Sequence, residues 1–253
     1  MVADPTILAE PWPVERFAEI DSTNLEARRR SEQGETGPVW LTASRQVQGR
    51  GRLGRNWTMP EGNLAATALF PLSGRLADAP LICFAAGLAV VDAAEASSPG
   101  CMGKLALKWP NDVLSGAAKL CGILIETGTT PRGAWVAAGF GVNLAAAPER
   151  VEQPTVSLSE LGNGLVVTPE AFLAALDEAF RSRLAQMQSE GFEATRSAWI
   201  ARAAYLGREV VRNTESGILR GVMQGIAEDG ALILELPDGR VHHVRAGEVS
   251  VLN

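Results

Sequence analysis

Residues 46–57 read QVQGRGRLGRNW, and residues 108–112 read KWPND. Three glycines and three arginines within positions 49–55 cannot form a core element, so the first stretch is predicted to be a mobile, basic loop. Glycine lets the backbone come close to a ligand, and the arginine fork matches phosphate and carboxylate oxygens. The loop is therefore suited to fold over a triphosphate or an acyl phosphate. A solvated surface turn and an RNA-binding arginine–glycine segment are the alternatives.

The common nucleotide-binding motifs are not found in this sequence. No GxxxxGK[ST] pattern occurs, which excludes the usual phosphate-binding loop of NTPases. Residues 49–54 have some GxGxxG character, but the last glycine is displaced by one position and a tryptophan follows instead of a helix. A dinucleotide-binding Rossmann fold is therefore disfavoured.

Polar residues and glycines interrupt the β-rich runs that follow the loop. Lys108 ends an apolar strand before a rigid turn, where it could bridge two anions at a pocket rim or be an ordinary strand-end residue. Small residues recur in the runs 119–126 and 139–143. Small residues inside strands allow a flat ligand to lie against the backbone, although close packing between layers is the commoner cause.

The pattern around these motifs predicts an α+β fold with two domains. Thr23 and Glu26 have capping-box spacing at the start of a helix. Strands are predicted at 39–43, 64–70, 105–109, 119–126 and 133–143, and helices at 25–32, 81–96, 168–188 and 193–204. The segment 145–167 is predicted to run over the surface. Short β-rich runs at 208–212, 218–226, 231–236, 241–245 and 249–252, separated by Asp-Gly turns, predict a small barrel. We place the boundary near Leu206, giving domains 1–205 and 206–253.

Composition narrows the class of protein. The 253 residues are 46% hydrophobic, enough to bury a core, and carry a net charge of −6 with a pI near 5.1. This balance argues against nucleic acid as the main partner. The three cysteines, Cys83, Cys101 and Cys121, are widely spaced, which predicts reduced, packed thiols. The first residues do not form a signal peptide, and the apolar run 81–96 is too short to span a bilayer. We expect a cytoplasmic protein with a buried core helix at 81–96.

Taken in order, these motifs resemble the biotin–protein ligases, also called biotin–acetyl-CoA-carboxylase ligases. The resemblance rests on Ser22-Thr23-Asn24, the loop with Gln46, the KWPND segment, and the runs 119–126 and 139–143, and it extends from about Phe17 to the C-terminus. It implies a mixed β-sheet catalytic domain with helices packed on it, of the class II synthetase type, followed by a small SH3-like barrel. Cys121 and Gln48 stand where smaller residues are usual in the family.

The resemblance also assigns roles to individual residues. It implies that biotin is bound by Ser22, Thr23, Asn24, Gln46, Gly49, Arg50, Lys108, Gly122 and Gly139. It implies that ATP and the adenylate are bound by Arg50, Gly51, Arg52, Arg55, Trp57, Asn111 and Asn143. Lys108 and Arg52 are the expected catalytic residues, and no direct metal ligand is assigned. We expect Lys108→Ala to keep the fold and slow adenylate formation severely.

The implied reaction consumes biotin and ATP with Mg²⁺ and proceeds through biotinyl-5'-AMP. The acceptor is a lysine in the biotin carboxyl carrier domain of a biotin-dependent carboxylase. Some twenty residues before Ser22 are too few for a helix-turn-helix domain, so we expect no DNA partner, no membrane partner and no repressor activity. A monomer and a homodimer are both compatible with the sequence. Lipoate–protein ligases and octanoyltransferases share the catalytic fold and are the nearest alternative; an RNA-binding module is a more distant one.

Overall fold

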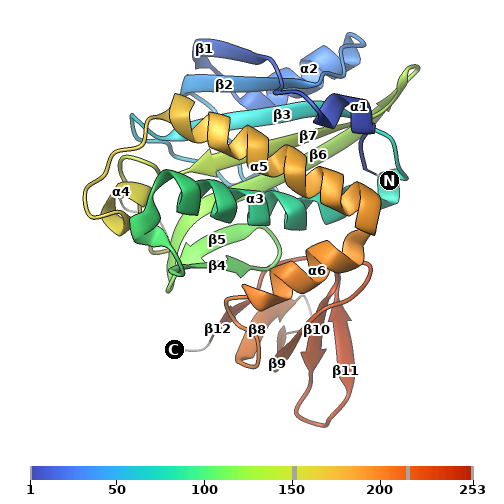
Figure 1. Ribbon diagram of the computed structural model, residues 1–253. Coiled ribbons are helices and arrows are strands. Elements are labelled where there is room, and N and C mark those ends of the chain that lie inside the picture. Colours follow the sequence, from blue (N-terminus) through green and yellow to red (C-terminus); the bar gives the residue numbers. More distant parts are fainter. Residues whose placement is uncertain (1, 150–152, 215–216, 252–253) are drawn as a thin grey trace.

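The computed structural model describes residues 2–149, 153–214 and 217–251 and arranges them around two β-sheets (Figure 1). The larger sheet consists of β1 (Val14–Ile20), β2 (Val39–Gln46), β3 (Leu64–Leu72), β4 (Leu105–Lys108), β5 (Asp112–Ser115), β6 (Ala118–Thr130) and β7 (Gly133–Val142). Its strand order is β1-β2-β3-β7-β6-β5-β4. The sheet is mixed because β1 pairs with β2 in parallel while the other neighbours are antiparallel.

Helices cover the two faces of this sheet unequally. The helices are α1 (Pro5–Leu8), α2 (Thr23–Glu32), α3 (Ile82–Ser97), α4 (Leu158–Leu161), α5 (Pro169–Glu190) and α6 (Phe192–Ala201). The long helices α3 and α5 lie side by side across one face (Figure 1). Because strand side chains alternate between faces, Ala68 and Ala138 join the core beneath these helices, while Leu69 and Ala137 pack with Ala27 of α2 in a second cluster. The sheet is therefore apolar on both faces.

The run predicted as a buried core helix is confirmed as one. Within the described residues, Leu76–Ser97 is the one helical segment long and apolar enough to cross a membrane, and most of it is buried inside the fold. It comprises a short 3₁₀ turn (Leu76–Leu81) and α3. Apolar burial against the sheet and α5 is the main force that holds such a helix in place.

The second sheet begins after α6. It consists of β8 (Glu209–Thr214), β9 (Gly217–Ile226), β10 (Leu232–Glu235), β11 (Val241–Val244) and β12 (Ser250–Val251), in the antiparallel order β11-β10-β9-β8-β12. It contacts the larger part through a buried hydrogen bond, in which Trp109 Nε1 donates to the Gly230 carbonyl at 3.0 Å. The two-part α+β architecture predicted from the sequence is thus present. The exact boundary near Leu206 stays a prediction.

The structure corrects several local expectations. Thr23 is not the cap of α2. Ser22 holds that position and makes no side-chain capping bond, while the Thr23 hydroxyl donates to Gln46 Oε1. The strands β1 and β5 were not predicted. β1 is an edge strand without a fully buried residue, so it lacks an alternating apolar pattern. The predicted surface segment contains the short helix α4; its residues 150–152, and Leu252 of the predicted last strand, lie outside the described residues.

Candidate functional site

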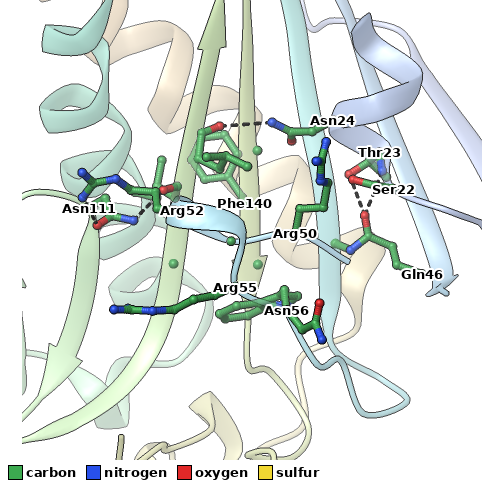
Figure 2. Close-up of a pocket in the computed structure, with 18 of the residues that line it drawn as sticks. Ser22, Thr23, Asn24, Gln46, Arg50, Arg52, Arg55, Asn56, Asn111 and Phe140 are labelled. Atoms are coloured by element: carbon green, nitrogen blue, oxygen red, sulfur yellow. Dashed lines mark hydrogen bonds between the residues drawn. The ribbon is translucent and has the colours of Figure 1, made fainter. Parts of the chain in front are cut away.

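A cavity of about 100 Å³ lies where the start of α2, the glycine–arginine loop and strands β6 and β7 meet (Figure 2). Most of the residues predicted for the site line it together: Ser22, Thr23, Asn24, Gln46, Arg50, Gly51, Arg52, Arg55, Trp57, Asn111, Gly122 and Gly139. Segments more than 100 residues apart in the sequence therefore converge on one place. The volume is smaller than the roughly 300–1,000 Å³ of ordinary ligand pockets.

The start of α2 forms the polar end of this cavity. Gln46, the last residue of β2, accepts two hydrogen bonds at Oε1, from the Thr23 backbone N–H at 2.8 Å and the Thr23 hydroxyl at 3.1 Å (Figure 2). Thr23 is almost completely buried. Helix N-termini leave backbone N–H groups unpaired, and here a side-chain amide satisfies one of them. This arrangement fixes the orientation of both residues.

Asn24 is held by the neighbouring strands. Its Nδ2 donates to the Leu124 carbonyl at 3.3 Å and to Glu126 Oε2 at 2.8 Å, and its Oδ1 lies 2.7 Å from the Thr67 hydroxyl. Gly139 makes this possible, because a Cβ at that position would overlap the Asn24 amide. The glycine in β7 is therefore explained by close side-chain approach.

The glycine–arginine loop has a defined local geometry. Arg50 and Asn56 form an antiparallel bridge, and the Gly51 N–H donates to the Arg55 carbonyl at 2.8 Å. Leu53, at the tip, has a positive φ of 56° and is largely exposed. From this turn Arg52 Nη1 donates to Asn111 Oδ1 at 3.1 Å (Figure 2). The arginine side chains are thus directed toward the cavity and its rim.

Trp57 closes the opposite wall. Its indole packs against the backbone of Gly122 and Gly141, and a Cβ on Gly141 would overlap the ring. The indole Nε1 is buried and has no hydrogen-bond partner among the described residues. A buried donor without a partner costs free energy, so this ring can gain a bond when a ligand enters or when it moves.

A buried carboxylate lies between two lysines beside the cavity. Lys119 Nζ is 2.6 Å from Asp112 Oδ1 and 5.7 Å from the centre of the Trp57 ring, whereas Lys108 Nζ is 3.9 Å from Asp112 Oδ2. Lys119 and Asp112 line the cavity and Lys108 does not. The structure therefore does not bring Lys108 into the lining of this cavity, and its contact with a ligand stays a prediction.

Two other predicted residues also lie outside the lining. Gly49 fixes the base of the loop. Its carbonyl accepts a hydrogen bond from the Trp57 N–H at 2.9 Å, and a Cβ at this position would meet the Trp57 carbonyl. Asn143 is buried, and its Nδ2 donates to the carbonyls of Lys119 and Val156 at 3.2 and 3.3 Å. Both residues hold the neighbours of the cavity in place.

Sequence reasoning gave no role to nine residues of the lining: Asn56, Ala65, Asp112, Lys119, Ile123, Leu124, Phe140, Gly141 and Glu248. Lys119, Ile123, Leu124, Phe140 and Gly141 lie in the runs 119–126 and 139–143, which belong to the family motifs. A lysine at the start of such a motif is a sequence signal for an anion contact, so Lys119 could have been predicted. Glu248 carried none, because it comes from the C-terminal part and reaches the cavity only through folding.

The cavity is cationic on balance. Arg50, Arg52, Arg55 and Lys119 face the two carboxylates of Asp112 and Glu248. Burial raises the pKa of Glu248, but the hydrogen bond from Arg55 and the charges of Lys108 and Arg52 outweigh burial and leave this pKa below its usual value. Both carboxylates are already paired with cations. The remaining positive charge suits an anionic ligand such as a carboxylate or a phosphate.

A second cavity of about 310 Å³ adjoins the first and shares Arg52, Asn111, Ile123 and Leu124 with it. Cys83 lies in its wall, and burial raises the pKa of this thiol to about 12. Within the described residues, no group of three or more His, Cys, Asp or Glu side chains is arranged to hold a metal ion.

Comparison with known proteins identifies the family. Residues 15–143 match the model of the Biotin/lipoate A/B protein ligase family, and residues 205–252 match that of the Biotin protein ligase C terminal domain. The chain is 45% identical to a biotin–[acetyl-CoA-carboxylase] ligase of Paracoccus denitrificans, over 88% of this chain and 95% of the relative. It is 31% identical to the corresponding Mycobacterium tuberculosis protein, over 92% and 86% of the two chains.

Solved structures agree with the sequence matches. The biotin protein ligase of Aquifex aeolicus in complex with biotin and ATP is 28% identical and superimposes with a TM-score of 0.77, covering 94% of this chain and 97% of that one. A point mutant of the same Aquifex aeolicus protein in complex with biotin gives a TM-score of 0.78 at 26% identity and the same coverage. The chain therefore belongs to the biotin/lipoate A/B protein ligase family, and within it to the biotin–protein ligases.

Proposed function

We propose that this protein is an ATP-dependent ligase that activates biotin as biotinyl-5'-AMP and transfers it to a lysine of a biotin carboxyl carrier domain. The observation that carries the proposal is that one cavity is lined both by neutral hydrogen-bonding groups and by cations. Thr23 and Gln46 offer the neutral hydrogen-bonding groups. Arg50, Arg52 and Lys119 offer the cations. Biotin has a matching group for each kind, with a cyclic urea at one end and a carboxylate at the other.

In the first step the biotin carboxylate attacks the α-phosphorus of Mg–ATP, a mixed anhydride forms, and pyrophosphate leaves. Negative charge gathers around the α-phosphate during this step. Arg52 and Lys119 stabilise that charge, since positioned cations in a site shielded from water lower the barrier most effectively. Lys108 and Lys119 approach the two oxygens of the Asp112 carboxylate, so Lys108 adds positive charge beside Lys119. We assign Trp57 and Asn111, which both line the cavity, to the nucleotide.

In the second step the amine of the carrier lysine attacks the carbonyl of the anhydride, and AMP leaves. No covalent bond to the enzyme is needed. Consistent with this, all three cysteines are free thiols, and burial raises the pKa of each. The thiol form is a poor nucleophile.

Magnesium enters as part of its ATP complex. Mg²⁺ commonly keeps several waters and binds through substrate phosphates with few protein carboxylates. Asp112 is the carboxylate of the cavity wall nearest the two lysines, and its existing ion pairs leave it little capacity for a metal. The residues present therefore suit delivery of the ion by the nucleotide. We further propose that the reaction takes place in the cytoplasm.

The proposal is tested by separating the two steps. The purified protein is incubated with Mg–ATP and biotin, freed of small molecules, and then mixed with a carrier domain from a biotin-dependent carboxylase. Biotin should appear on one carrier lysine by mass spectrometry, and a carrier with that lysine replaced by arginine should stay unlabelled. Labelling without ATP, or of the arginine carrier at equal rate, would contradict the proposal.

A further inference from the structure

A hydrogen-bond chain continues from Thr23 into the sheet through residues outside the predicted site. Thr67 lies in β3, opposite Gly139 of β7, and is completely buried. Its Oγ1 is 2.8 Å from the Thr23 hydroxyl and 2.7 Å from Asn24 Oδ1. On the far side of Asn24, Glu126 of β6 accepts from Nδ2 at 2.8 Å. The chain thus runs from Glu126 through Asn24 and Thr67 to Thr23.

The direction of this chain is fixed at its Glu126 end. A backbone carbonyl and an ionised carboxylate can only accept hydrogen bonds. Because Leu124 O and Glu126 both face the same end of the Asn24 amide, that end must be the NH₂ group. The amide oxygen therefore faces Thr67. A hydroxyl has one proton, so Thr67 donates that proton to Asn24 and has only lone pairs left for Thr23.

The consequence reaches the cavity at Thr23. Its hydroxyl proton has two acceptors, Thr67 Oγ1 at 2.8 Å and Gln46 Oε1 at 3.1 Å, and both belong to the protein. Thr67 is the nearer one and cannot donate in return. Toward the cavity the Thr23 oxygen therefore presents a lone pair. A group that donates an N–H can bond to it, and a group that only accepts cannot.

We propose that Thr67, oriented by Glu126 through Asn24, is a positioning residue that makes Thr23 an obligatory acceptor and so selects a cyclic urea. This inference rests on the proposed function. Biotin carries two urea N–H groups, whereas the dithiolane of lipoate and the alkyl chain of octanoate carry none. Asn24, expected from the sequence to contact biotin, acts here through Thr67, because both hydrogens of its amide are used by Leu124 and Glu126.

The central test removes the Thr67 hydroxyl while keeping its shape. In Thr67→Val, the KM for biotin in pyrophosphate release should rise roughly three- to tenfold, the effect of one hydrogen bond. The kcat and the KM for ATP should stay within about twofold, and Thr67→Ser should restore the biotin KM. The competitor 5-(thiolan-2-yl)pentanoic acid has the sulfur ring and side chain of biotin but no urea. Its inhibition constant should be the same in wild type and Thr67→Val.

A matched control tests whether replacing a buried threonine by valine is harmless in itself. Thr195 of α6 is buried, 1% exposed, and its hydroxyl has no partner among the described residues. Thr195→Val should leave every kinetic constant unchanged. The Glu126 end gives a second test that does not alter the core: Glu126→Ala should raise the biotin KM, whereas Glu126→Gln, which keeps an acceptor, should not. This pair decides the matter if Thr67→Val does not fold.

Two results would overturn the inference. One is a biotin KM in Thr67→Val that equals the wild-type value. If Thr67→Val does not fold, the same result in Glu126→Ala would overturn the inference. The other is an equal weakening of biotin, ATP and the urea-free competitor, because that pattern marks general damage to the cavity. Failure of wild type to release pyrophosphate with biotin would instead contradict the proposed function, so the two failures are distinguishable.

Discussion

Arg55 donates from Nη1 to both carboxylate oxygens of Glu248, at 2.7 and 2.8 Å, although 193 residues separate the two in sequence. Arg55 belongs to the glycine–arginine loop, and Glu248 belongs to the C-terminal part of the chain. Both line the cavity. The C-terminal part therefore does more than pack against the larger sheet, because it also holds one end of the glycine–arginine loop.

Breaking this ion pair should free the loop without destabilising the fold. The side chains are 57% and 30% exposed, and exposed pairs contribute about 0–1 kcal/mol. We expect Glu248→Gln to change the free energy of unfolding by no more than about 1 kcal/mol. The substitution should also speed trypsin cleavage after the loop arginines. Biotin with ATP should protect the loop in both proteins. An unchanged cleavage rate in Glu248→Gln would show that the pair does not restrain the loop.

The contribution of the Arg55–Glu248 ion pair should change with pH only at acidic pH. The folded-state pKa of Glu248 lies below its usual value of 4.5, so its contribution is present above that value and is lost as pH falls through the folded-state pKa. Hydrogen exchange of the Gly51 and Trp57 amides, which are bonded within the loop, should therefore report no change in opening near neutral pH once the intrinsic rate is corrected. A transition in opening near neutral pH would contradict this assignment.

Lys119 and Lys108 should differ in their effect on adenylate formation. Lys119 lines the cavity, whereas Lys108 does not line it and has a side chain that is 10% exposed. We expect Lys119→Ala to lower kcat for pyrophosphate release by about 100-fold, the scale seen when one positioned charge-stabilising group is removed. Lys108→Ala should have the smaller effect, and both variants should keep the wild-type circular dichroism spectrum. If Lys108→Ala were the slower enzyme, the assignment made from sequence would stand and the one based on the cavity wall would fail.

Trp57 should report nucleotide binding. Its indole rests on Gly122 and Gly141, and the buried Nε1 has no hydrogen-bond partner among the described residues. A purine that binds at this wall should therefore stack on the indole or displace it. We expect ATP to change tryptophan emission in wild type and to leave it nearly unchanged in Trp57→Phe, which keeps the other five tryptophans. Gly141→Ala should displace the ring in advance and raise the KM for ATP. Equal emission changes in wild type and Trp57→Phe would exclude Trp57 as the reporter.

The three thiols should resist alkylation in the native protein. Burial raises the pKa of Cys83 to about 12 and also raises that of Cys101 and Cys121. Because the thiolate is the reactive form, iodoacetamide at mildly alkaline pH should modify the folded chain far more slowly than the unfolded chain. Mass spectrometry of each cysteine peptide measures this directly. Rapid modification of native Cys83 would show that the second cavity leaves its thiol ionised and open.

The sequence predicted the central elements of the fold because their patterns are local. Apolar runs marked β3, β7 and α3, and Thr168 was correctly read as a cap, since it accepts from the Ala171 N–H at 3.2 Å. Edge strand β1 escaped because none of its residues is fully buried, so no buried face imposes an apolar–polar alternation on its sequence. The capping box read at Thr23 failed for a different reason, which is that the Thr23 hydroxyl serves Gln46 and Thr67 instead of its own helix.

The site was predicted through its motifs and missed where it depends on tertiary contacts. The loop arginines, Gln46 and Thr23 carry recognisable spacing and do line one cavity. Thr67 stands in an ordinary strand and Glu248 near the C-terminus, so only the folded chain brings them to Thr23 and Arg55. Lys108 and Lys119 both approach Asp112, and only the folded chain shows that Lys119 lines the cavity and Lys108 does not.

The most direct test of the account is pyrophosphate release from Mg–ATP with biotin, lipoate or octanoate supplied separately to the purified protein. The account predicts release with biotin alone, without any carrier domain, because adenylate formation precedes transfer and Thr23 accepts only an N–H donor. Release with lipoate or octanoate but not with biotin would contradict the claim about substrate while leaving the family and the fold intact.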